Sequence, residues 1–265
     1  MENPNMAEST KTGLVAFFDI LGYQNLLERN EPEVIAEEVL PILIGMKGKI
    51  RVSVFTSFVK NLDSESKNLS NEDRENIIKA IAATLLSMDW VVFSDTIVLT
   101  LPINQEAIHE QRLLPWMIFF SAASLIQNEL FDAGLPSRGA VDYGKFFVRD
   151  SCFAGRTIVN AYKLCNQIEL SACILSKLVA NEMDSMLSLS GRRKQFFENY
   201  LVEYLVPLKD GERHFLVLKS IPSSIKDDVL TTVLSAFWGR GKDIPKEAQS
   251  KVVNTQQWLE FLKNH

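Results

Sequence analysis

Histidine, cysteine and net positive charge are scarce in this chain of 265 residues. Its three histidines and three cysteines fit neither a histidine-rich metal site nor a disulfide framework or zinc spacing. Lysine and arginine total 28 against 33 aspartates and glutamates, which gives a net charge of −5. Because nucleic-acid-binding domains usually carry a basic excess, a general nucleic-acid surface is not expected. A single nucleotide could still bind through local positive groups and metal ions.

Long apolar segments are also missing. The first 13 residues, MENPNMAESTKTG, are polar and lack the apolar centre of a signal peptide. No apolar run approaches the roughly 18 residues that suggest a membrane span, and LPWMIFFSAASLI is too short. With 46% hydrophobic and 23% charged residues, the composition is typical of a soluble globular protein. We therefore expect a cytoplasmic protein without a membrane partner, and a disordered start over residues 1–12.

Hydrophobic patterning predicts a mixture of strands and helices after this start. Strands are expected at 13–20, 50–59, 90–101 as a hairpin, 137–148, 172–176, and 200–220 as a second hairpin that turns at 209–211. Helices are expected at 23–46 in pieces divided by prolines, 72–87, 105–133, from 155, near 176–184 and 191–198, and at 223–238 and 244–263. There is no internal repeat or interdomain linker. The pattern predicts one α+β domain, with a mostly antiparallel sheet and helices against it.

Two aspartates interrupt otherwise apolar strand segments. Asp19 lies in GLVAFFDILGYQNLL, and Asp95 lies in VVFSDTIVL. A buried carboxylate is unfavourable unless it is paired, hydrogen-bonded or bound to a metal, although each residue could instead be a cap or turn aspartate. If adjacent strands bring the two together, they repel each other unless a proton or cation is shared. Magnesium suits such a pair, because it takes few carboxylates and leaves positions for phosphate oxygens.

Four short motifs follow one another along the chain: FFDILGY, FSDTIV, RGAVDYG and GRTIVNAYKL. Together they resemble the class III nucleotidyl cyclase catalytic domain. That family includes adenylate and guanylate cyclases and the pyrimidine cyclases of the bacterial Pycsar anti-phage system. The motif-bearing core is about 13–175, whereas the hairpin and helices of 199–263 match only in their general pattern. The resemblance implies a single cyclase-like catalytic domain over 13–265, with a ferredoxin-like palm core.

The resemblance implies a site for two divalent ions, Mg²⁺ or Mn²⁺. Asp19 and Asp95 match the metal-binding aspartates of the family, and the carbonyl of Ile20 matches its backbone ligand. One ion would lower the pKa of the ribose 3′-hydroxyl, and the other would neutralise the departing pyrophosphate. The implied reaction is an in-line attack on the α-phosphorus, in which positioning and charge stabilisation dominate.

The same resemblance suggests residues that bind the phosphates. The turn Leu21, Gly22 and Tyr23 would lie under the triphosphate, where glycine permits close approach of the backbone. Lys209, in PLKDG, could approach the β- or γ-phosphate as a late-strand lysine does in the family, or it could be a solvated turn residue. Arg138 could contact a phosphate or an interface, or be a surface or salt-bridged arginine.

The GRTIVNAYKL motif departs from the family pattern. Counted from Gly155, the usual transition-state arginine falls on Lys163 and the usual asparagine falls on Val159. Lysine keeps the charge but loses the bidentate fork, and Lys163 could also be a solvated helix-surface lysine. Asn160 is adjacent, but neighbouring residues of a helix lie about 100° apart, so it need not substitute for the asparagine. Lys163 and Asn160 are the catalytic candidates.

The positions that read a purine base in the family fall near Val91 and Cys152. Neither residue can make the polar contacts, and specificity by hydrogen bonding needs the groups that make the bonds. This favours a pyrimidine triphosphate, UTP first and CTP second, as in the Pycsar branch. The product would then be cyclic UMP or cyclic CMP, which in that system activates a separate cyclic-nucleotide-binding effector.

The resemblance also implies a two-fold homodimer, in which the metal aspartates and the transition-state residue of one site come from opposite subunits. Two other functions stay open. One is an adenylate or guanylate cyclase with altered base recognition. The other is a catalytically silent nucleotide-binding regulatory module, which Lys163 and Val159 favour and the retention of both aspartates disfavours.

Overall fold

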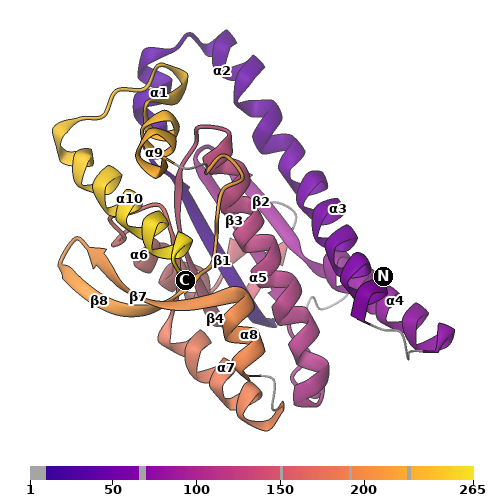
Figure 1. Ribbon diagram of the computed structural model, residues 1–265. Coiled ribbons are helices and arrows are strands. Elements are labelled where there is room, and N and C mark those ends of the chain that lie inside the picture. The colour runs from indigo at the N-terminus through magenta and orange to yellow at the C-terminus, as the bar shows by residue number, and fades with distance from the viewer. Residues whose placement is uncertain (1–9, 66–69, 150–151, 191–192, 226–227) are drawn as a thin grey trace, which may run out of the picture.

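The computed structural model describes residues 10–65, 70–149, 152–190, 193–225 and 228–265 (Figure 1). Most of the predicted disordered start, 1–12, lies outside the described residues. Its last two positions, Lys11 and Thr12, belong to the first strand.

One eight-stranded sheet organises the described chain. Its strand order is β2-β3-β1-β4-β6-β8-β7, and β5 pairs only with β4. The strands are β1 (Lys11–Ile20), β2 (Asp89–Phe93), β3 (Thr96–Pro102), β4 (Ser137–Arg149), β5 (Cys152–Ala154), β6 (Cys173–Leu175), β7 (Leu201–Leu208) and β8 (Gly211–Leu218). All of these pairs are antiparallel except β4 with β6. The predicted α+β class, a mostly antiparallel sheet with flanking helices, is confirmed.

Helices cover both faces of this sheet (Figure 1). They are α1 (Tyr23–Arg29), α2 (Pro32–Glu38), α3 (Leu40–Glu65), α4 (Asn71–Ser87), α5 (His109–Asp132), α6 (Arg156–Cys165), α7 (Lys177–Ser190), α8 (Arg193–Tyr200), α9 (Val229–Trp238) and α10 (Gln249–Lys263), with 3₁₀ turns at Gly239–Gly241 and Lys246–Ala248. None of the helices in the described part of the chain combines the length and the apolar character that crossing a bilayer requires.

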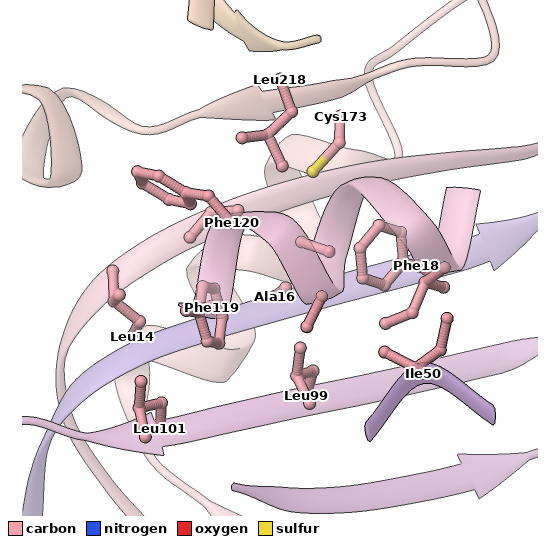
Figure 2. Packing of buried hydrophobic residues seen from close by; sticks show 14 of the residues in the cluster. Leu14, Ala16, Phe18, Ile50, Leu99, Leu101, Phe119, Phe120, Cys173 and Leu218 are labelled. Carbon is pink, nitrogen blue, oxygen red and sulfur yellow. The ribbon is translucent and has the colours of Figure 1, made fainter. Parts of the chain in front are cut away.

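The central strand β1 is apolar along its length because its two faces enter different cores. Leu14, Ala16 and Phe18 pack toward α5, whose Phe119 and Phe120 lie over them in Figure 2. The alternate side chains of β1 join a second core with α6, α9 and α10. A strand covered on both sides has no need of a polar face, which explains the unbroken run that precedes Asp19.

One predicted strand is wrong. Residues 50–59, IRVSVFTSFV, lie within the long helix α3. Their alternation suggested a strand, but Met46, Ile50 and Val54 recur four residues apart and are all buried. That spacing places them on one helical face, which packs into the same core as α5.

Candidate functional site

The two aspartates singled out from the sequence lie at neighbouring positions of the sheet. Asp19 is near the end of β1 and pairs in register with Thr96, the first residue of β3. Asp95 occupies the turn before it, and its carbonyl accepts a hydrogen bond from the amide of Ile20 at 2.9 Å. Ser94 has a positive φ of 55°, a conformation that lets the β2–β3 hairpin turn tightly at this point. The predicted hairpin therefore brings Asp95 beside the end of β1.

Arg138, the second residue of β4, is paired with Asp19. Its Nε and Nη2 donate to Oδ2 of Asp19 at 2.9 and 2.8 Å. Its other donors reach the side-chain oxygen and carbonyl of Asn166 and the carbonyl of Ile168. A guanidinium has five N–H groups, so these contacts engage all of them. Arg138 therefore forms a salt bridge with Asp19, and its predicted contact with a phosphate stays a prediction.

The ion pair with Arg138 does not fully offset the effects that disfavour the ionised form of Asp19. Burial raises the pKa of Asp19 above its usual value; Arg138 lowers it, Asp95 raises it and Lys209 lowers it. The net shift is upward, so the ionised carboxylate is disfavoured where it stands. A divalent cation between Asp19 and Asp95 would remove that imbalance. The pair of carboxylates therefore fits a hard cation such as Mg²⁺, which prefers oxygen ligands.

The turn after β1 has the backbone shape predicted for it. Gly22 has φ 75° and stands at the start of α1, so glycine is favoured there by conformation. Among the described residues, and apart from the chain neighbours of Gly22, the one atom within 4 Å of the place of its Cβ is Cδ of Lys242, at 3.8 Å. Leu21 and Tyr23 on either side are buried, and burial followed by the charge of Asp95 raises the pKa of Tyr23. The turn is thus fixed by its neighbours while its glycine leaves room above the backbone.

Lys242 was not recognised from the sequence as part of this region. It is 6% exposed, and its ammonium donates to the carbonyls of Gly134 and Ala236 at 2.7 and 3.1 Å. Burial, followed by the charge of Arg240, lowers the pKa of Lys242 to about 8. Cations are stabilised at the C-terminal ends of helices, where backbone carbonyls lack partners. The ammonium of Lys242 donates to carbonyls at the ends of both α5 and α9. No local sequence pattern marks this, because one of its two partners, Gly134, lies 108 residues away and meets it only through the fold.

The remaining predicted residues lie in three places. Lys209 is exposed in the β7–β8 turn, near enough for its charge to act on Asp19. Asn160 and Lys163 are exposed on α6 and line a pocket that contains neither aspartate. One chain therefore brings together the two aspartates, the Gly22 turn and Lys209, but leaves the two catalytic candidates apart from them.

The predicted base-reading positions flank an apolar groove of about 430 Å³. Val91 lines it, and Cys152 is exposed in β5 beside Phe153, another lining residue. Val159 and Tyr162 complete the α6 side of this groove. A ligand in this groove would be bound mainly by apolar contacts and by the shape of the groove, because few polar groups line it.

Comparison with known proteins gives structural neighbours only. No family model matches the chain, and no curated protein matches it. Among solved structures, the guanylyl cyclase Cya2 has a TM-score of 0.44 at 10% identity, covering 83% of this chain and 98% of its own. The guanylate cyclase domain of RhGC from Catenaria anguillulae, in complex with GTP, has a TM-score of 0.38 at 9% identity, covering 78% and 96%. The adenylate/guanylate cyclase/hydrolase from Silicibacter pomeroyi has 0.34 at 16%, covering 79% and 97%.

Proposed function

We propose that this chain is a nucleotidyl cyclase that converts a pyrimidine nucleoside triphosphate into its 3′,5′-cyclic monophosphate and pyrophosphate. The observation that carries the proposal is the meeting of Asp19 and Asp95 beside the Gly22 turn. Each residue belongs to one of the four ordered motifs that resemble the class III cyclases. The charge of Asp95 contributes to raising the pKa of Asp19, and a cation shared by the two carboxylates would offset that contribution.

Each residue of the proposed centre has a distinct task. Asp19, Asp95 and the carbonyl of Ile20 would hold two ions, Mg²⁺ or Mn²⁺, whose chemistry is activation of the 3′-hydroxyl and neutralisation of the leaving pyrophosphate. Arg138, on the neighbouring strand β4, holds the carboxylate of Asp19 in place. The turn of Leu21, Gly22 and Tyr23 would pass under the triphosphate, with Lys209 near its end.

A homodimer would complete the site. Asn160 and Lys163 lie apart from the aspartates of their own chain, so they would act on the nucleotide held by the partner subunit. The surface around the apolar groove is suited to a second copy, because Phe93 is 77% exposed and Tyr162 is 50% exposed. Two-fold symmetry would then form two equal composite sites.

Mixing two inactive variants tests the composite site. Asp19→Ala removes the metal side and Lys163→Ala removes the transition-state side, so each pure protein is expected to be inactive. After subunit exchange, each heterodimer would contain one intact site, and up to about half of the sites in the heterodimers should turn over. Exchange is verified with two differently tagged chains, and a mixture of Asp19→Ala with Asp95→Ala serves as the control. No recovered activity after verified exchange would contradict shared sites.

The substrate test uses the four nucleoside triphosphates with Mg²⁺ or Mn²⁺, alone and in competition at equal concentration. We expect UTP to be cyclised best and CTP second, with ATP and GTP poor. Because the groove at Val91 is apolar, shape rather than hydrogen bonding would favour the pyrimidines over the purines, by about 10–200-fold. Preferential cyclisation of ATP or GTP would favour a purine cyclase with altered base recognition. Nucleotide binding without any product would favour a silent regulatory module.

The biological role is proposed from the same resemblance. A cyclic pyrimidine nucleotide made in the cytoplasm would act as a second messenger for a separate effector, as in anti-phage defence. Genes beside that of this protein would indicate such an effector if they encode a cyclic-nucleotide-binding domain.

A further inference from the structure

The segment that follows α9, residues 239–243, lies beside α1 (Figure 1). Asn30, at the end of α1, donates from its Nδ2 to the carbonyl of Arg240 at 3.0 Å. The amide of Asp243 donates to Oδ1 of Asn25 at 2.8 Å. The partners in these two hydrogen bonds are 210 and 218 residues apart in the sequence. The segment is therefore attached to α1 at two points.

Side chains of the same segment contact the turn between α5 and β4. Nε of Arg240 donates to the carbonyl of Ala133 at 2.8 Å. The buried ammonium of Lys242 donates to the carbonyl of the next residue, Gly134, at 2.7 Å. Carbonyls at the end of a helix lack partners within it, and these two side chains supply them. The 239–243 segment therefore fixes the α5–β4 turn as well as α1.

The α5–β4 turn supports the turn that is predicted to bind the phosphates. The amide of Leu21 donates to the carbonyl of Pro136 at 2.8 Å. Lys242 also lies against this turn, with its Cδ 3.8 Å from the place of a Cβ on Gly22, while Gly22 itself is exposed. The ammonium of Lys242 is buried and engaged by two carbonyls. It is therefore placed to hold the turn rather than to contact a phosphate.

The backbone of Arg240 is in an unfavourable conformation. Its φ is 59°, in the left-handed region that residues other than glycine seldom adopt. Such conformations persist where the surroundings impose them, and they are concentrated at functional sites. The residue is held by Asn30, by Ala133 and by the carboxylate of Glu38, which lies 3.0 Å from its Nη1. These contacts, rather than local preference, determine the path of the segment.

We propose that the 239–243 segment positions the Gly22 turn for the triphosphate, and that Lys242 and Arg240 are its positioning residues. Neither side chain would touch the nucleotide, because each holds a backbone carbonyl of the α5–β4 turn. The inference rests on the proposed function, and it gives a task to a part of the chain that none of the four cyclase-like motifs covers. A displaced turn would bind the phosphates more weakly before and during the reaction alike, so KM should rise without a change in kcat.

The experiment compares Lys242→Met with the wild type in two measurements on the full chain. Hydrogen exchange followed by mass spectrometry, without nucleotide, measures the protection of residues 20–27. We expect exchange there to be about 10-fold faster or more in the variant, with β7 and β8 unchanged. Cyclisation of UTP with Mn²⁺ is the second measurement, in which we expect KM to rise about 10-fold and kcat to stay within about twofold.

Two further variants separate positioning from the loss of a lysine as such. Lys219→Met removes an ammonium that likewise donates to a carbonyl near the end of a helix, that of Glu198 in α8, at 2.9 Å, and it should behave as the wild type. Arg240→Asn keeps a residue type that tolerates the left-handed conformation, but its side chain is too short to reach Ala133. It should change both measurements in the same direction as Lys242→Met. Should Lys242→Met fail to fold, as thermal unfolding would show, Arg240→Asn decides.

Unchanged exchange of residues 20–27 in both Lys242→Met and Arg240→Asn would overturn the proposal, as would faster exchange with an unchanged KM. Equally faster exchange throughout the chain would also overturn it, because the segment would then contribute only general stability. If the wild type makes no cyclic product from any of the four triphosphates, the proposed function fails. The exchange measurement needs no nucleotide, so it would then decide the positioning of the turn by itself.

Discussion

Asp19→Asn and Asp95→Asn are each expected to lose cyclase turnover by about 10³-fold or more, while both proteins remain folded. Asparagine keeps the size of the side chain and an oxygen that can accept from Arg138, but it removes the charge that would bind the cations. The measurement is cyclic nucleotide formed from UTP with Mn²⁺ or Mg²⁺, together with a thermal unfolding curve for each variant.

A matched control is Asp63→Asn, which removes a carboxylate of α3 that pairs with Arg74 at the surface. It should leave turnover unchanged. Wild-type activity in either Asp19→Asn or Asp95→Asn would contradict the metal assignment. Equal loss in the control would point to a general effect of charge.

Arg138→Met is expected to lower the free energy of unfolding by about 3–5 kcal/mol at neutral pH. The guanidinium side chain is 11% exposed, and its removal leaves Asp19 and two backbone carbonyls without their donors. Denaturation by urea measures the loss. Arg213→Met, in a pair whose side chains are more than half exposed, is the control and should cost at most about 1 kcal/mol.

The pH dependence of this loss identifies its cause. Without Arg138, the folded-state pKa of Asp19 would rise further, because burial and Asp95 both raise it. A carboxyl whose pKa is raised by folding destabilises the protein above its unfolded pKa and ceases to do so as pH falls. The difference between Arg138→Met and the wild type should therefore be smaller at pH 4 than at pH 7. A difference independent of pH would assign the loss to packing and the carbonyls alone.

The sequence predicted correctly those elements whose hydrophobic pattern fits only one type of secondary structure. Residues 13–20 are too short and too continuously apolar for anything but a buried strand, and 90–101 has two β-rich runs around a polar turn. Residues 50–59 satisfied both a two-residue and a four-residue period. These residues form a helix because one helical face packs beside α5. That is a tertiary interaction, which the local sequence pattern does not reveal.

The site was predictable to the same extent. A carboxylate inside an apolar run marked both Asp19 and Asp95 in the sequence. The partners of Arg138 were not predictable, because Asn166 and Ile168 lie 28 and 30 residues away and meet it only through the fold.

The amine of Lys242 couples unfolding to the uptake of a proton in mildly alkaline solution. Its pKa is about 8 in the folded chain, against about 10.4 for an exposed lysine. At pH 9 the folded chain therefore holds this amine mostly neutral, and a chain that unfolds takes up close to one proton. Stability gains from this group as pH rises from about 8 toward 10.5. Over the same interval the positive charge of Lys242 beside the Gly22 turn disappears, so alkaline conditions that raise the contribution of this group to stability would weaken the proposed attraction of that turn for a polyanion.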